Sequence, residues 1–222
     1  MMNKIGILGT GMVGTTLGTK LIQLGYEVKM GSRDAANKYA VEWVNQNGGK
    51  ASAGGFNEAA KFGDIIFLCV KGDATLSVIK TLQPENVKGK TIIDITNPIL
   101  FSNEKSTPVL IPELANTNSQ GEEIQKLLKD ANVVKTLNMV YCKVMTDPKR
   151  AGSDATMFIS GNNKTAKTQV NEILNQFGWK DIIDLGNIAT ARSMEMLVIL
   201  WLNTMNAINN MDFAFKIVKQ EK

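Results

Sequence analysis

Short apolar runs alternate with longer segments of helical spacing along almost the whole chain. The apolar runs are bounded by glycine or polar residues, as buried strands are, and the longer segments repeat apolar residues with the period of a helix. We expect strands at residues 4–8, 26–30, 50–53, 64–70, 91–96, 132–137, 156–160 and 181–185. We expect helices at residues 12–24, 35–47, 57–62, 74–82, 122–129, 164–177 and 189–219. Polar residues 102–120 predict a long loop.

This alternation predicts an α/β fold, because strands joined by helices pair in parallel. The strand at 64–70 agrees, since its apolar run is typical of a parallel strand covered on both faces. We therefore predict a doubly wound, mostly parallel Rossmann-type sheet with a short helical C-terminal extension. The 222 residues contain no internal repeat or linker. They predict a single domain over residues 1–222, with the helical C-terminal part at about 187–222.

A glycine-rich segment joins the first predicted strand to the first predicted helix. It has the spacing G-x-G-x-x-G, and a strand–turn–helix is the setting in which this motif binds dinucleotides. The first glycine permits the tight turn, the second lets the backbone approach the pyrophosphate, and the third lets helix and strand pack closely. A structural turn without a ligand is the alternative. The segment comprises Gly9, Thr10, Gly11, Met12, Val13 and Gly14.

The end of the second predicted strand indicates which dinucleotide binds. Proteins that prefer NAD place a carboxylate there, on the ribose 2′-hydroxyl, whereas this chain has Ser32 and Arg33. A guanidinium binds a phosphate as a planar fork, and Lys38 adds positive charge, so we predict a preference for NADP(H). Asp34 is interpreted as the cap of the next helix. The alternative is a surface arginine with no ligand.

The ends of later strands predict further pocket residues. Asn97 and Asn138 follow two strands at the edge where α/β sheets bind ligands. The dipeptide Asn97-Pro98 also fits a simple turn. Lys71, after the strand at 64–70, would attract an acidic substrate or a phosphate of the cofactor. A solvated surface lysine is the alternative.

Composition narrows the chemistry. The chain has no histidine and two cysteines, Cys69 and Cys142. The commonest general base is therefore missing, and neither a zinc site nor an activated thiolate is expected. Cys69 lies in an apolar run and is expected in the core. No catalytic acid or base is identified. The charge of +4 comes from 25 basic and 21 acidic residues scattered along the chain, which favours phosphate ligands over nucleic acid.

Nothing in the sequence predicts membrane contact. The N-terminal residues lead straight into a strand and lack the apolar stretch of a signal peptide. The longest apolar run, from Met196 to Leu202, is far too short to span a bilayer. We expect a cytoplasmic protein. The apolar stretch from Met194 to Phe215 is interpreted as core, and it is also where we expect the contact of a homodimer.

Several of these segments together resemble the NADP oxidoreductases that use coenzyme F420. The resemblance spans nearly the whole chain and is most specific in Gly31-Ser32-Arg33 and in the C-terminal pattern. It implies hydride transfer between NADP and a flavin-like or deazaflavin ring stacked against it. The segments that carry it are residues 9–14, 31–33, 94–98, 134–138, 186–188 and 191–195. The residues that the resemblance places around the nicotinamide are Val70, Lys71, Ala74, Leu137 and Asn138.

Three functions remain open from the sequence. The first is an NADPH-dependent oxidoreductase that exchanges hydride with a small redox substrate such as coenzyme F420 or a flavin. The second is a non-enzymatic NADP(H) sensor that changes partners on binding. The third is a reductase of small imines or keto acids, although such proteins carry a longer helical C-terminal domain. Tyr141 and Lys143 would share one face of a strand and form a proton-donor pair, but solvent-facing or substrate-gating side chains are favoured.

Overall fold

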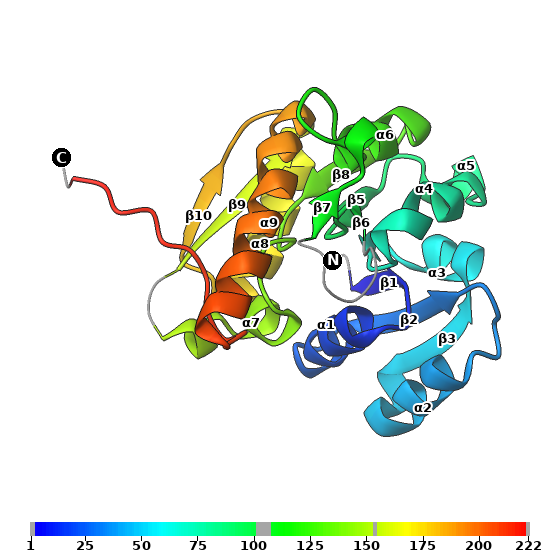
Figure 1. Cartoon of the computed structure of the whole chain (residues 1–222). Coiled ribbons are helices and arrows are strands. Elements are labelled where there is room, and N and C mark those ends of the chain that lie inside the picture. Colours follow the sequence, from blue (N-terminus) through cyan, green and yellow to red (C-terminus); the bar gives the residue numbers. More distant parts are fainter. Residues whose placement is uncertain (1–2, 101–107, 153–154, 221–222) are drawn as a thin grey trace.

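An eight-stranded sheet runs through the centre of the protein (Figure 1). The computed structural model describes residues 3–100, 108–152 and 155–220. The strand order is β10-β9-β8-β5-β4-β1-β2-β3, and among the described neighbours β8–β9 is antiparallel while the other pairs are parallel. The predicted doubly wound, mostly parallel sheet is confirmed. The strands are β1 (Lys4–Leu8), β2 (Glu27–Ser32), β3 (Ala51–Gly55), β4 (Ile65–Leu68), β5 (Thr91–Asp94), β8 (Asn132–Lys135), β9 (Thr156–Gly161) and β10 (Asp181–Asp184).

Helices cover both faces of this sheet (Figure 1). One apolar cluster includes residues of α1, α2, α7 and α8, and the other includes residues of α3, α4, α5 and α6. Helix α9 crosses near the carboxyl edge of the sheet and contacts α6 and β9. The helices are α1 (Met12–Gln23), α2 (Lys38–Asn47), α3 (Phe56–Phe62), α4 (Gly72–Lys80), α5 (Pro84–Val87), α6 (Gln120–Leu127), α7 (Cys142–Thr146), α8 (Lys164–Phe177) and α9 (Ala191–Ile208).

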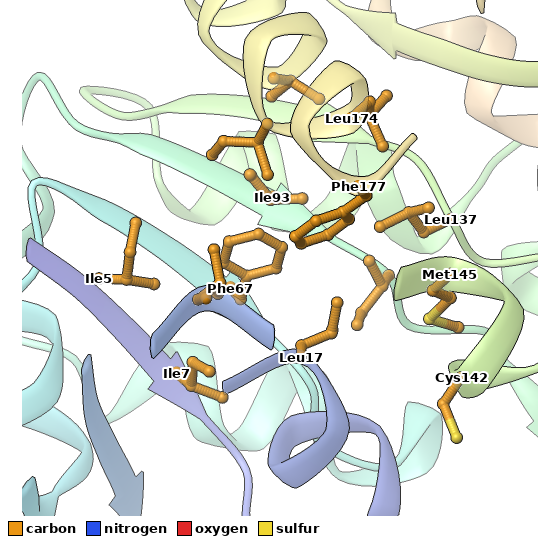
Figure 2. Packing of buried hydrophobic residues seen from close by; sticks show 14 of the residues in the cluster. Ile5, Ile7, Leu17, Phe67, Ile93, Leu137, Cys142, Met145, Leu174 and Phe177 are labelled. Carbon is orange, nitrogen blue, oxygen red and sulfur yellow. The ribbon is translucent and has the colours of Figure 1, made fainter. Parts of the chain in front are cut away.

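Strand β4 shows why its sequence is apolar throughout. Ile65 and Phe67 pack into the first cluster, while Ile66 and Leu68 pack into the second. Figure 2 shows Phe67 in the first cluster, between strand β1 and the end of α8, where it lies near Phe177. Both faces of the strand are therefore removed from water, as expected for a central parallel strand.

The first strand of the chain is an interior strand of the sheet. Strand β1 pairs with β2 on one side and with β4 on the other. Strands β2 and β3 extend the sheet in one direction, and β4, β5 and β8 extend it in the other. In sheets of this kind, ligands bind outside the carboxyl ends of the strands, at the point where the order in which strands are added to the sheet changes from one side to the other. The glycine-rich segment follows β1 directly and therefore lies at that point.

Two local predictions about the second helix are wrong. Helix α2 begins at Lys38 rather than at residue 35. Its cap is Asn37, whose Oδ1 accepts hydrogen bonds from the amides of Tyr39 and Ala40 at 3.1 and 3.2 Å. Asp34 instead accepts the amide of Ala36 at 2.9 Å, which is a tight turn ahead of the helix. Asp34 and Asn37 both have side chains that can cap a helix. Asn37 is the cap, because it directly precedes the first residue of α2.

The predicted loop at 102–120 holds regular structure where it is described. Residues 101–107 lie outside the described part. Beside them, β6 (Ile99–Leu100) pairs antiparallel with β7 (Val109–Leu110), and a 3₁₀ turn spans Pro112–Leu114. Helix α6 begins at Gln120, where the Ser119 hydroxyl accepts the amide of Glu122 at 3.1 Å. Helix α5 was not predicted, because its four residues are too few to show a helical period.

The C-terminal segment is not helical to residue 219 as predicted. Helix α9 ends at Ile208, and Asn209 has the left-handed conformation that often terminates helices. Residues 210–217 then form a C-terminal strap. Phe213 stacks on Trp201 with ring centroids 5.4 Å apart, and the carbonyl of Phe215 accepts the amide of Thr156 at 2.9 Å. The strap thereby covers the start of β9.

This strap gives a stability prediction. We expect Phe213→Ala to lower the free energy of unfolding by about 1–3 kcal/mol, because a stacked aromatic pair and its buried area are lost. Urea unfolding measures the change. Val218→Ala is the matched control, since Val218 is 90% exposed, and it should change the stability by less than about 0.5 kcal/mol. Equal stability of Phe213→Ala and the control would show that the stack of Phe213 on Trp201 contributes nothing.

Candidate functional site

The glycine-rich turn is built by backbone constraints. Gly9 has a φ of 127°, which a side chain would strain, and its amide donates to the carbonyl of Gly31 at 2.9 Å. A side-chain carbon on Gly14 would overlap the carbonyl oxygen of Gly9. The first and third glycines therefore shape the turn and pack α1 against it, as the motif requires.

The second glycine leaves open space. A side-chain carbon built on Gly11 would meet no other atom within 4 Å, and Gly11 itself is exposed. Gly11 is the residue that caps α1, and it has no side chain to accept the first amides of the helix. An uncapped helix N-terminus with an open approach fits an anionic group such as a pyrophosphate. Around it, Met12 is exposed, whereas Thr10 and Val13 are partly buried.

Strand pairing brings the two halves of the predicted cofactor motif together. Leu8 lies opposite Gly31 in the β1–β2 register, so Ser32, the last residue of β2, and Arg33, which follows it, lie beside the glycine-rich turn. Ser32 is buried, and its hydroxyl donates to the carbonyl of Asp34. Arg33 is exposed and makes no ion pair within the described residues. Lys38 is also exposed, with its ammonium 5.1 Å from the ring of Tyr39.

The residues after β4 lie at the same edge of the sheet. Val70 and Ala74 are partly buried, while Lys71 is exposed and caps α4 through its backbone. Cys69 lies just beyond β4 and is partly buried, so it is neither in the strand nor fully in the core. Burial, and then the charge of Asp94, raise the pKa of the Cys69 thiol. The thiol therefore stays protonated and is a poor nucleophile.

Asn97 and Asn138 are brought together. Asn138 Nδ2 donates to Asn97 Oδ1 at 2.7 Å, and Asn97 Nδ2 donates to the carbonyl of Asn138 at 2.7 Å. Asn138 Nδ2 also donates to the carbonyl of Met194 in α9 at 2.9 Å. Asn138 Oδ1 is buried without a hydrogen-bond partner among the described residues. Pro98 is buried beside this pair.

Leu137 has an unusual backbone. Its φ is 59°, in the left-handed region that leucine rarely adopts. Its side chain is fully buried in the first cluster, near Phe177 and Met145 (Figure 2). Any contact of Leu137 with a ligand would therefore come from its backbone.

A buried charge cluster lies behind the asparagines, and the sequence interpretation assigned it no role. The ammonium of Lys135 is 2.9 Å from Asp94 Oδ2 and 2.8 Å from Glu195 Oε1. None of the three side chains is more than 1% exposed. Asp94 and Lys135 are direct neighbours in the β5–β8 register. The available signal was a charged residue directly after two apolar residues at the end of each of the two strands.

Further hydrogen bonds stabilise this cluster. The two oxygens of Glu195 accept the amides of Gln120 and Gly121 at the start of α6, at 2.9 and 3.0 Å. Burial would lower the pKa of Lys135, but Asp94 and Glu195 outweigh it and raise that pKa. Burial also raises the pKa of Glu195, against the opposing charge of Lys135. The lysine is therefore charged at neutral pH.

The other proposed reactive residues do not form a site. Tyr141 and Lys143 stand at the start of α7 rather than on a strand, so they do not share a strand face. Cys142 is buried, and the hydroxyl of Thr16 lies 3.7 Å from its sulfur. No group of three potential His, Cys, Asp or Glu metal ligands occurs among the described residues. Over the same residues, no helix has the length and apolarity needed to cross a membrane.

The fold and the glycine-rich turn define a dinucleotide-binding α/β protein. The family described as "NADP oxidoreductase coenzyme F420-dependent" matches residues 4–98. An F420-dependent NADP reductase of Methanocaldococcus jannaschii is 34% identical over 203 residues, which cover 87% of this chain and 88% of the relative. The chain therefore belongs to the family of coenzyme F420-dependent NADP oxidoreductases and is an NADP-dependent oxidoreductase.

Three further proteins show how far this similarity extends. A crystal structure assigned as an F420-dependent NADP reductase from Arthrobacter sp. FB24 has a TM-score of 0.92 and 36% identity, covering 99% of this chain and 100% of the other. The metalloreductase STEAP3 of Rattus norvegicus is 27% identical over 87% of this chain but only 36% of its own length. A reductive aminase of Aspergillus terreus shares the fold, with a TM-score of 0.66 and 19% identity over 94% of this chain and 63% of the other.

The buried cluster gives a second stability prediction. Lys135→Met leaves two carboxylates buried without their shared cation, and we expect it to cost about 3–5 kcal/mol of unfolding free energy. Lys126→Met is the control, because the Lys126–Glu123 ion pair has a lysine that is 64% exposed. That variant should cost about 0–1 kcal/mol. Chemical denaturation compares the two, and similar costs would contradict the importance assigned to the cluster.

Proposed function

We propose that this protein transfers hydride between NADP(H) and a flavin-like ring, with coenzyme F420 as the first choice of partner and a flavin as the second. The observation that carries the proposal is the pairing of an open, uncapped helix N-terminus at Gly11 with an exposed Arg33 at the adjacent strand end. The family supports it, and so does the name of the reductase from Methanocaldococcus jannaschii that matches most of the chain.

In this proposal the residues of the glycine-rich turn bind the pyrophosphate through backbone amides. Arg33 and Lys38 bind the 2′-phosphate, because exposed cations pair with a phosphate. Ser32 supports them from behind, since its buried hydroxyl donates to the carbonyl of Asp34 and holds the turn that contains Arg33. The nicotinamide would then reach the carboxyl ends of β4, β5 and β8, where Val70, Lys71, Ala74, Asn97, Pro98, Leu137 and Asn138 lie.

The cofactor supplies the hydride chemistry when it is bound. The protein contributes alignment of two rings and exclusion of water. This division suits a chain without histidine, in which the site offers paired amides and buried ion pairs rather than a general base. We propose no side chain as an acid or base.

We also propose that the whole chain is one functional unit and that it pairs with a second copy. The outer face of α9 carries Met196 and Leu200, which are 41% and 53% exposed. Exposed apolar side chains on one helix face are typical of a protein contact. Sedimentation at several protein concentrations tests the dimer.

The first functional prediction concerns the cofactor. Arg33→Ala should weaken NADPH binding by about 1.5–3 kcal/mol and leave NADH binding unchanged, because it removes a charge-assisted contact to the 2′-phosphate alone. Calorimetric titration with both nucleotides measures this. Lys88→Ala is the matched control, since Lys88 is an exposed cation between α5 and β5, at the opposite edge of the sheet. Unchanged discrimination in Arg33→Ala would rule out its proposed role.

The second functional prediction concerns turnover. The protein should oxidise NADPH in the presence of oxidised coenzyme F420, and the reverse reaction should reduce NADP. Gly11→Ala should fold normally, because its new side chain meets open space, yet it should lose activity where the pyrophosphate must approach. NADPH consumption with coenzyme F420, flavins, quinones and ferric chelates tests the acceptor. Tight NADPH binding with no turnover on any acceptor would favour a sensor instead.

A further inference from the structure

Lys135 connects three separate parts of the fold. Besides its two ion pairs, its ammonium donates to the carbonyl of Thr96 at 2.5 Å. The three acceptors come from the end of β5, the segment after it, and helix α9. An ammonium has three donors, and all three are used. A side chain in this position is fixed in direction as well as in place.

Two of these contacts lead directly to the asparagine pair. Thr96 precedes Asn97 in the chain, and Glu195 follows Met194, whose carbonyl accepts Asn138 Nδ2. Lys135 therefore holds the residue before Asn97 and the residue after Met194, the acceptor of Asn138 Nδ2. The pair itself closes through two hydrogen bonds of 2.7 Å. Displacing Lys135 would release the asparagines from both sides.

The backbone between Lys135 and Asn138 is also constrained. Thr136 donates its amide to the carbonyl of Asp94 at 3.1 Å and its hydroxyl to the carbonyl of Phe158 at 2.9 Å. Leu137 then takes its left-handed conformation. Such a conformation costs about 1–3 kcal/mol in a residue other than glycine and persists only where its surroundings enforce it. Buried anchors on both sides of Leu137 supply that enforcement.

The polar character of the cluster is itself informative. Apolar side chains of similar volume often stabilise a fold as well as a buried ion pair does. Apolar contacts are not directional, however, so they do not fix the orientation of the neighbouring backbone groups. The ions here act on backbone that leads to the carboxyl edge of the sheet. Asn138 Oδ1, which has no hydrogen-bond partner in the described part of the chain, lies at that edge. Direction matters there, because hydride transfer depends on the alignment of the two rings.

We propose that Lys135 is a positioning residue for hydride transfer, which acts through Thr96 and Glu195 to hold the Asn97–Asn138 pair at the nicotinamide end of the cofactor site. The inference rests on the proposed function for the location of the nicotinamide. It adds a role for three buried charges that lie behind the asparagine pair.

The test compares Lys135→Met, Asn138→Ala and the double variant in single-turnover hydride transfer from NADPH to coenzyme F420. We expect Lys135→Met to slow transfer by about 10- to 100-fold, as small misplacements of reacting groups do. We expect the double variant to be no slower than the slower single variant, because both changes remove one positioning unit. If the fold-reduction in rate of the double variant equals the product of the two single fold-reductions, the proposal is overturned.

Two further variants separate positioning from loss of stability. Lys167→Met is the control, since Lys167 is 14% exposed and joins α8 to Asp184 at 2.7 Å, away from the asparagines. It should transfer hydride at the wild-type rate. If Lys135→Met does not fold, Glu195→Gln takes its place, because it removes one charge of the cluster at constant size. We expect Glu195→Gln to slow hydride transfer as well. A wild-type rate in the folded Glu195→Gln or Lys135→Met variant would overturn the proposal.

Binding provides a readout that does not need turnover. The probes are NADP⁺ and 2′,5′-ADP, which has the adenosine and 2′-phosphate but no nicotinamide. We expect Lys135→Met, or Glu195→Gln in its place, to lower NADP⁺ affinity and leave 2′,5′-ADP affinity unchanged. Equal loss for both ligands would indicate general damage and overturn the proposal. If the wild-type protein binds NADP⁺ but reduces no acceptor, only the proposed function is contradicted. The affinities of the variants for NADP⁺ and for 2′,5′-ADP would still test the role of Lys135.

Discussion

The Asp94–Lys135 pair is the interaction on which the ligand edge of the sheet depends. The two residues are neighbours in the β5–β8 register, and both side chains are fully buried. A buried ammonium must find several acceptors, because water cannot solvate it. Here those acceptors include Glu195, which also accepts the first amides of α6. The buried Lys135 cluster thereby joins β5 and β8 to the start of α6 and to α9.

The rest of the site depends on backbone rather than on reactive side chains. The turn after β1 offers amides, and the edge beside it offers an exposed guanidinium. The thiol of Cys69 is kept protonated by burial and by Asp94, and histidine is absent from the sequence. Such a site suits a reaction in which bound cofactors carry the electrons and the protein supplies geometry.

The relatives show how widely this module is used. The likeness covers 88% of the reductase from Methanocaldococcus jannaschii but about a third of the metalloreductase and under two thirds of the reductive aminase chain. The shared part spans 87% of this chain in the metalloreductase and 94% in the reductive aminase, so the chemistry of each of these proteins must be argued from its own site. In this chain α9 contacts α6 and β9, and the C-terminal strap packs on the start of β9.

The sequence by itself determined the type of fold and the first half of the site. The apolar runs, the helical periods and the glycine spacing are local patterns, and local patterns reflect backbone geometry directly. Only the tertiary structure showed that Asn97 and Asn138 are paired, that Tyr141 and Lys143 are not, and that Glu195 meets Lys135. The contacts depend on strand order and register, which bring together Asn97 and Asn138, 41 positions apart, and Lys135 and Glu195. A single sequence carries no signal for contacts of that range, because they arise only when the sheet is assembled.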